Sequence, residues 1–231
     1  MTRGSSGAGR RGEVRLPAVV AVLVAIGLQA ALPNRLVLGP RLLVPALEVV
    51  LLLPLVAINP VRMTKETRLS RSVSLALVLL IAVANTGVLA LLVDALADGK
   101  AKDGKQLLLA ALQVWLTNVI AYGLVYWELD RGGPVSRTQK PRTELPDADF
   151  RFPQDEDHDA SVEVARGSSQ KNDWVPVLTD YLYVSVTNSS AFSPTDTMPL
   201  RSRTKMLMAL QSTSALVLSL LVVAHAVGTL K

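Results

Sequence analysis

The run VSLALVLLIAVANTGVLALLVDAL, residues 73–96, decides the fold class of this 231-residue chain, because Asp94 is its only charged residue. About 20 consecutive apolar residues suffice for an α-helix to cross the hydrocarbon core of a bilayer. Half of the whole chain is hydrophobic but only 4% is aromatic, so Leu, Val and Ala dominate. Lipid-facing helices need only be apolar, whereas soluble cores usually mix in more aromatic residues. The sequence therefore predicts a membrane protein.

Four further apolar runs have comparable length and are bounded by charged residues or by Gly and Pro. They cover residues 16–32, 36–58, 107–127 and 206–230. The basic residues ahead of the first run resemble a secretory signal, but the run is long for a signal core, so we expect it to remain as a span. The pattern predicts an all-α membrane protein with five transmembrane helices.

The distribution of Lys and Arg sets the expected orientation, because positive residues stay on the cytoplasmic side of a membrane. A cytoplasmic N-terminus places 18 of the 24 basic residues inside. Four regions follow: a basic cytoplasmic tail (1–15), a four-helix membrane region (16–130), a charged linker (131–173) and a C-terminal region with the last span (174–231). The C-terminus is then expected outside. The linker has dense charge, scattered Gly and Pro and no persistent period, which predicts a flexible cytoplasmic segment.

Several function classes have no support in the sequence. The chain contains no Cys, which excludes disulfides, thiolate metal sites and Cys nucleophiles. It has no P-loop, GxGxxG or HExxH motif, and its two histidines, His158 and His225, are far apart. We therefore expect no enzyme activity, no cofactor and no metal site. The net charge of +5 comes from basic residues beside apolar runs, so the expected partner is the lipid bilayer and not nucleic acid.

Three predicted spans carry a strongly polar residue near the middle: Glu48, Asn85 and Asn118. Polar groups at membrane depth usually face the bundle interior and find partners. One interpretation is a structural hydrogen-bonded layer, with Glu48 protonated or leaning toward Arg41. The other is a site for a cation, a proton or a polar solute. Both stay open at this point.

The segment YVSVTNSSAFSPTDTMPL, residues 183–200, precedes the last apolar run and is too polar to cross a membrane. Together with the run that follows, it resembles the pore helix, filter and inner helix of simple potassium channels, over residues 178–230. Ser185 and Asp196 have the eleven-residue spacing of the family's pore-helix Ser and filter-closing Asp. The candidate pore-loop residues are Ser185, Thr187, Asn188, Ser189, Ser190, Ser193 and Asp196.

The filter itself departs from the channel pattern. Residues 191–195, AFSPT, stand where the family has TVGYG. Pro194 fixes its own φ and pushes Ser193 into extended geometry, whereas a filter uses glycines to point successive carbonyls inward. The basic residues at 201, 203 and 205 also place the loop on the cytoplasmic side. We therefore expect residues 177–190 to form a short re-entrant or interfacial half-helix without a working potassium filter.

The whole chain also resembles a group of uncharacterised bacterial multi-pass membrane proteins. The shared motifs are WELDRGGP, residues 127–134, and DYLY with TNSSAFSPTDTMPL, residues 180–183 and 187–200. This resemblance implies the bacterial cytoplasmic (inner) membrane and brings no established activity. Two function classes follow. One is a channel-like or transporter-like protein. The other is a non-transporting scaffold that forms a homo-oligomer or binds a cytoplasmic partner through residues 131–173.

Overall fold

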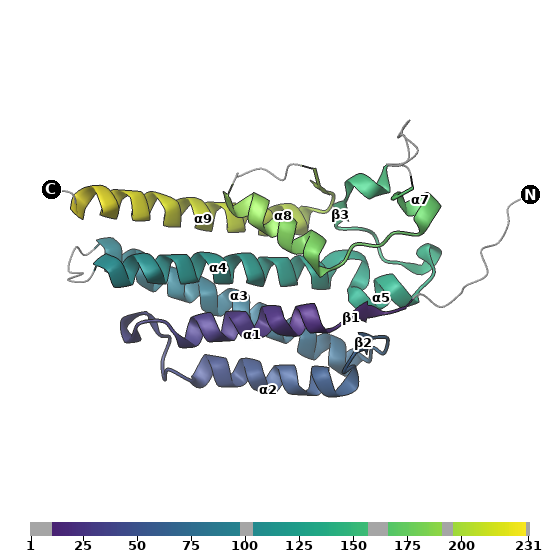
Figure 1. The fold of residues 1–231 in the computed structure, drawn as a ribbon, viewed down its shortest axis with the longest axis horizontal. Coiled ribbons are helices and arrows are strands. Elements are labelled where there is room, and N and C mark those ends of the chain that lie inside the picture. The colour runs from purple at the N-terminus through teal and green to yellow at the C-terminus, as the bar shows by residue number, and fades with distance from the viewer. Residues whose placement is uncertain (1–10, 98–103, 157–165, 191–195, 230–231) are drawn as a thin grey trace, which may run out of the picture.

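The computed structural model describes residues 11–97, 104–156, 166–190 and 196–229. The fold is mostly helical, as predicted, and five helices lie side by side in an elongated bundle (Figure 1). They are α1 (Leu16–Ala30), α2 (Leu43–Ile58), α3 (Arg68–Ala97), α4 (Gly104–Leu129) and α9 (Ser202–Thr229). Helices α3 and α4 pack along each other, with α1 and α2 on one side and α9 on the other.

Three of these helices, α3, α4 and α9, are long and apolar enough to cross a membrane, rather than the five predicted. Helices α1 and α2 are apolar but have only 15 and 16 residues. The second predicted span is short because its first part is not α-helical. Gly39 has a φ of +77°, and Pro40 follows it, so the chain turns before α2 begins. The 3-10 helix η1 (Asn34–Leu36) occupies the start of that run.

Arg41 lies in this turn and not on α2, so the predicted approach of Arg41 to Glu48 along one helix is wrong. The Arg41 guanidinium instead donates to the carbonyl of Ala30 at 3.0 Å and to Oδ1 of Asn34 at 3.0 Å. A cation at the C-terminal end of α1 satisfies carbonyls that have no partner within that helix.

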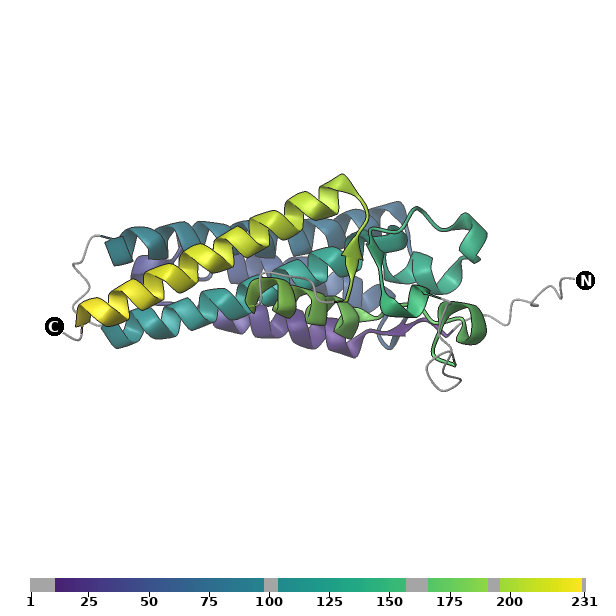
Figure 2. The same cartoon turned by 90° about the horizontal axis from the view of Figure 1, so that it is seen from above.

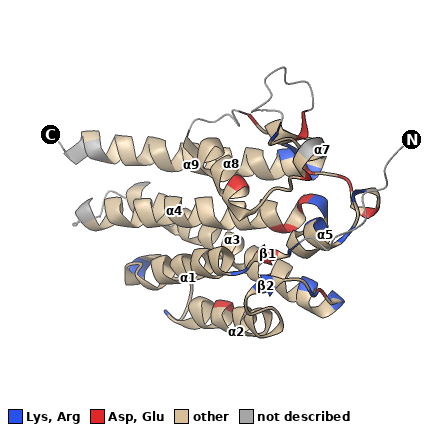
Figure 3. Cartoon of the chain, turned by 45° about the vertical axis from the view of Figure 1, so that its right-hand side comes forward, with Lys and Arg blue, Asp and Glu red and all other residues tan. Residues whose placement is uncertain are grey.

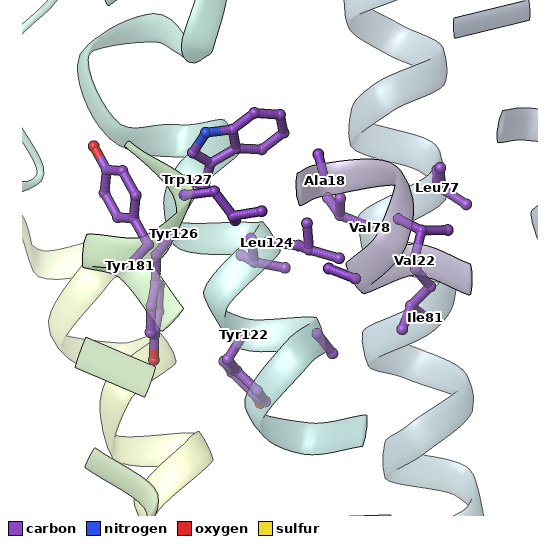
Figure 4. Close-up of a cluster of buried hydrophobic side chains, with 14 of the residues drawn as sticks. Ala18, Val22, Leu77, Val78, Ile81, Tyr122, Leu124, Tyr126, Trp127 and Tyr181 are labelled. Carbon is purple, nitrogen blue, oxygen red and sulfur yellow. The ribbon is translucent and has the colours of Figure 1, made fainter. Parts of the chain in front are cut away.

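The apolar core forms where α1 meets α3 and α4. Ala18 and Val22 of α1 lie against Ile81 of α3 and Leu124 of α4, and all four side chains are buried (Figure 4). Burial of this kind contributes about 25 cal/mol for each Å² of apolar surface removed from water.

The outer faces of α2 and α9 carry exposed apolar side chains, which include Leu53 and Leu220.

The charged residues gather at the end of the bundle where the described N-terminal residues lie (Figure 3). There β1 (Glu13–Val14) pairs antiparallel with β2 (Arg62–Met63). Several short elements follow α4 at the same end: η2 (Asp130–Gly132), α5 (Pro134–Gln139), η3 (Arg142–Glu144), β3 (Phe150–Arg151), η4 (Pro153–Asp155) and α7 (Ser169–Asn172). We call residues 130–156 the cap.

A flexible linker was predicted for residues 131–173. The structure shows ordered, packed elements over 131–156, while residues 157–165 of that prediction lie outside the described residues. Phe150 is fully buried and Phe152 is 3% exposed, and both stack edge-on against Tyr181. Arg137 is also fully buried. The sequence pattern failed because the charges of this segment find partners far away in the chain, so they are not solvated as a charged run usually is.

Helix α8 (Leu178–Ser190) agrees with the half-helix predicted for residues 177–190. It starts beside the cap and packs along α4 and α9 (Figure 2). After α8, β4 (Met198–Pro199) lies at the cap again, where it pairs antiparallel with β3. With 13 residues at 1.5 Å each, α8 extends about 20 Å, less than the roughly 30 Å hydrocarbon core of a bilayer.

Candidate functional site

The polar face of α8 meets one glutamine of α9. Gln211 is fully buried, and its amide Nε2 donates to Oγ of Ser185 at 2.6 Å and to Oγ of Ser189 at 2.8 Å. Its Oε1 accepts bonds from the Tyr126 hydroxyl at 2.7 Å and the Asn188 amide at 2.8 Å. One side chain therefore joins three helices.

Further bonds complete this network. Ser185 donates through Oγ to the carbonyl of Val119 at 2.7 Å, and Asn188 donates to the carbonyl of Met208 at 3.0 Å. Ser212 donates to Oδ1 of Asn188 at 2.9 Å. Ser185, Asn188 and Ser189 thus bond to α4 and α9, which holds the half-helix in place and leaves these groups engaged with protein.

Two other candidate pore-loop residues bond within their own helix. Thr187 and Ser190 donate to carbonyls of their own helix, at Tyr183 and Val186. Asp196 is exposed at the start of the next described stretch. Ser193 lies outside the described residues. The structure therefore brings together three of the seven residues that the sequence grouped as a pore loop.

The motif WELDRGGP marks the junction of α4 with the cap. Glu128, 2% exposed, accepts bonds from the Arg71 guanidinium and the Ser74 hydroxyl, one at each carboxylate oxygen. Arg71 also donates to the backbone carbonyl of Glu128. Removing one partner of such a buried pair leaves an uncompensated charge, so the pair fixes how α3 meets the end of α4.

Asp130 is fully buried and accepts hydrogen bonds from α8 and from the cap. Its Oδ2 accepts the Tyr181 hydroxyl at 2.6 Å, and its Oδ1 accepts the backbone N–H of Asp149 at 2.7 Å. The neighbouring Arg131 reaches Oδ2 of Asp155 at 2.6 Å. These bonds hold α8 and the cap against the end of α4.

The two glycines of the motif are required by backbone geometry. Gly132 and Gly133 have φ of +78° and +92°, a region that favours glycine, and they turn the chain from α4 into α5. A Cβ on Gly133 would overlap the guanidinium of Arg71. The glycine thus allows Arg71 to approach Glu128.

A second buried ion pair links the N-terminal residues to the cap. Nη2 of Arg137 lies 3.8 Å from Oε2 of Glu13. The central carbon of the Arg137 guanidinium lies 4.9 Å from the centre of the Tyr181 ring. Glu13 also accepts bonds from the Trp127 indole at 3.0 Å and the Leu178 N–H at 2.8 Å. Burial raises the pKa of Glu13, while Arg137 and these donors partly offset that rise.

The cap is closed by the first turn of α9. Asp149 is fully buried and accepts Arg203 Nη2 at 2.5 Å and the Thr204 hydroxyl at 2.6 Å. Asp149, Arg203 and Gln211 were not predicted as site residues. The amide of Gln211 within the apolar run 206–230 was the signal that pointed to it, since buried polar groups need partners.

The predicted polar layer is buried but is not a hydrogen-bonded layer. Glu48, Asn85 and Asn118 are 0%, 3% and 5% exposed. Neither carboxylate oxygen of Glu48 has a hydrogen-bond partner among the described residues, and the same holds for Oδ1 of Asn118. Gln29, on α1, is also buried and lies beside Glu48, but its Nε2 forms no hydrogen bond of ordinary geometry among the described residues.

The chemistry of these clusters is that of ion pairing and hydrogen bonding between helices. Within the residues that the structure describes, no three His, Asp or Glu side chains are grouped to hold a metal ion. Comparison of the chain with protein-family models, with curated proteins and with solved structures finds no match.

Proposed function

We propose that this chain is a multi-pass protein of the bacterial cytoplasmic membrane that conducts no potassium and offers its cap to a cytoplasmic partner. In this proposal the N-terminus and the cap are cytoplasmic, five helices cross the membrane and the C-terminus is outside. The gathering of basic residues at the cap end supports that orientation, because positive residues are retained inside (Figure 3).

The two short helices fit this topology. At 15 and 16 residues, α1 and α2 are each about 23 Å long, somewhat less than the roughly 30 Å hydrocarbon core. A bilayer adapts to a short helix by local thinning, at fractions of a kcal/mol for each Å. The alternation of direction from α1 to α4 supports crossings by all four (Figure 1).

The observation that carries the proposal is the engagement of Gln211. A conducting loop has to turn polar groups toward water or ions. Here Ser185, Asn188 and Ser189 turn toward Gln211 and the backbone of α4 and α9. The half-helix then acts as a brace that connects the cap to the bundle, in agreement with a scaffold.

The orientation is tested with a reporter enzyme that is active only outside the cytoplasm. Fusion at Lys231 is expected to be active, and fusion after Ser168 is expected to be silent. The reverse pattern would contradict the orientation and would favour the channel analogy, because pore loops of potassium channels enter from outside.

The absence of conduction is tested with the purified full chain in planar bilayers under a potassium gradient. We expect no potassium-selective current. A selective current that Asp196→Ala abolishes and that Asp147→Ala leaves intact would refute the proposal. Asp147 is a suitable control because its carboxylate is exposed, and its Oδ2 lies 3.6 Å from Nη2 of Arg201.

In this proposal the cap is the surface that binds a partner. A second copy of the chain is one such partner. The consecutive residues 139–144 are all exposed to solvent. Thr138, directly before them, and Asp149, farther along the cap, are buried. Site-specific photocrosslinking from Thr143 in cells is expected to give one discrete adduct. Crosslinking from Leu216, exposed on α9, serves as the control, and equal adduct patterns from both positions would contradict a role for the cap.

A second candidate function is proton-coupled transport through Glu48. The observation in its favour is the fully buried carboxyl group without a hydrogen-bond partner among the described residues. Intramembrane carboxyl groups often mark proton pathways. Proton uptake into liposomes that falls in Glu48→Gln but not in Asp94→Asn would favour transport over the scaffold.

A further inference from the structure

We propose that a pocket at the cap end of α1–α4 binds the phosphate group of an anionic phospholipid, with Arg15 as the principal contact. The pocket has a volume of about 40 Å³ and opens at the surface. It lies between the ends of α2 and α4, the starts of α1 and α3, and the start of α5. That volume holds a few water-sized groups. It therefore admits phosphate oxygens while the rest of a lipid stays outside.

Arg15 is the side chain that points to a ligand. It is only 8% exposed, and its Nε has no hydrogen-bond partner in the described parts of the chain. No ion pair or side-chain hydrogen bond of its guanidinium occurs among these residues. Its bonds are those of its backbone, where the N–H donates to the Val61 carbonyl at 3.0 Å and the carbonyl accepts the Val19 N–H at 3.1 Å. A buried cation without a partner is costly, so the site gains from an incoming anion.

Glu128 attracts Arg15 electrostatically, but no nearby carboxylate forms a direct ion pair with it among the described residues. Both oxygens of Glu128 are already bonded, one to Arg71 and one to Ser74. The Glu66 carboxylate is partly exposed and lies 3.8 Å from Arg71. Lys65 lines the same pocket and is exposed at its edge. The pocket thus holds three cations and two carboxylates. Among the described residues neither Arg15 nor Lys65 has a direct side-chain partner, but Lys65 is exposed to solvent and Arg15 is buried.

The neutral polar groups of the pocket are also engaged. The Asn59 side chain donates to the Lys65 carbonyl and accepts from the N–H groups of Thr64 and Lys65. The Ser70 hydroxyl is bonded to Thr67. Arg15 therefore remains as the group available to an anion.

The shape and position of the pocket favour a phospholipid headgroup. A guanidinium presents a planar fork of donors that matches phosphate oxygens. Leu55, Trp127 and Val135 form an apolar wall beside it. Basic pockets between membrane helices on the cytoplasmic side are the usual setting for anionic headgroups. The lipid as the source of the phosphate rests on the proposed membrane placement, whereas the affinity of Arg15 for an anion does not.

The test is a ligand titration of the purified full chain, with the thermal unfolding midpoint and native mass spectrometry as readouts. The ligands are phosphatidylglycerol, phosphatidylcholine and inorganic phosphate. We expect phosphatidylglycerol to bind and to raise the midpoint, and Arg15→Gln to weaken its binding by about tenfold or more. Arg68→Gln, an exposed arginine at the same end, removes the same charge and is the matched control.

Each outcome is decisive. If inorganic phosphate raises the unfolding midpoint as much as phosphatidylglycerol does, and Arg15→Gln loses this rise, the site binds a free anion. That result would contradict the lipid as the ligand. Equal binding of phosphatidylglycerol and phosphatidylcholine, or equal losses in Arg15→Gln and Arg68→Gln, would overturn the proposal. If Arg15→Gln fails to fold, Arg15→Lys keeps the charge but not the fork, and unchanged affinity there would contradict recognition by the guanidinium. The topology reporters test the membrane placement separately.

Discussion

The Tyr181 hydroxyl donates a 2.6 Å hydrogen bond to the buried carboxylate of Asp130, and this bond joins the half-helix to the end of α4. Tyr181→Phe removes only that bond. We expect a loss of about 2 kcal/mol in the free energy of unfolding, because the acceptor is a charged group in a buried site. Denaturant unfolding in detergent measures the change. Tyr183→Phe, on the exposed side of the same helix, should have little effect, and equal losses in both variants would show that the bond is unimportant.

Gln211→Leu roughly keeps the size of the side chain but removes every hydrogen bond that the Gln211 amide makes. The Tyr126 hydroxyl and the Ser189 hydroxyl each lose a partner in a buried site. We expect destabilisation of about 2 to 4 kcal/mol, measured as the shift in the unfolding midpoint. Ser214→Ala is the control, because that exposed hydroxyl bonds only to its own helix at Leu210. A neutral Gln211→Leu variant would refute the role of the network as a brace.

Gly133→Ala and Gly27→Ala should have opposite signs. At Gly133 the φ of +92° and the Arg71 guanidinium both oppose a methyl group, so we expect a loss of more than about 1 kcal/mol. Gly27 lies within α1, and no atom lies within 4 Å of the position that a Cβ would take. Alanine there should therefore raise the free energy of unfolding by about 0.5 to 1 kcal/mol. Thermal unfolding of the two variants side by side checks the prediction. A tolerated alanine at 133 would mean that Arg71 moves away from Glu128 without cost.

The raised pKa of Glu13 makes the stability depend on pH. A carboxyl group whose pKa is higher in the folded state binds its proton more tightly there. Its contribution is therefore fully present below a pH of about 4.5, its ordinary pKa, and is lost as the pH rises through the raised value.

Unfolding midpoints from pH 4 to pH 7 measure this effect. We expect the wild type to lose stability relative to Glu13→Gln as the pH rises, since Gln does not titrate. The exposed Glu144 provides the control variant Glu144→Gln. A difference between wild type and Glu13→Gln that stays constant with pH would contradict the raised pKa of Glu13.

Glu48→Leu tests whether the buried carboxyl group has a stabilising partner. The carboxyl group is buried and has no hydrogen-bond partner among the described residues, so leucine should be neutral or stabilising. The unfolding midpoint measures this. Destabilisation beyond about 1 kcal/mol would show that Glu48 has a partner in the native protein.

The long helices were predictable because their signal is local. Apolar length alone located α3, α4 and α9, and the resemblance to a pore helix located α8 within one residue at its start. The start of α2 was wrong, since residues 36–42 are mostly apolar and the effect of Gly39 and Pro40 was underestimated.

The cap was not predictable in the same way. Asp130 and Tyr181 are 51 positions apart, and Arg71 and Glu128 are 57 apart. No local period reveals such pairs, and dense charge alone usually indicates a solvated segment. In the candidate site, Ser185, Asn188 and Ser189 were identified, but their partner Gln211 was not.

The Asp149 carboxylate bonds to Arg203 and Thr204, which follow it by 54 and 55 positions. Synthesis proceeds at about 5–20 residues per second, so roughly 3 to 11 s pass before the ribosome supplies those partners. During that interval the α1–α4 portion is already synthesised, while Asp149 still lacks Arg203. We therefore expect the cap to close last, once the start of α9 has been made.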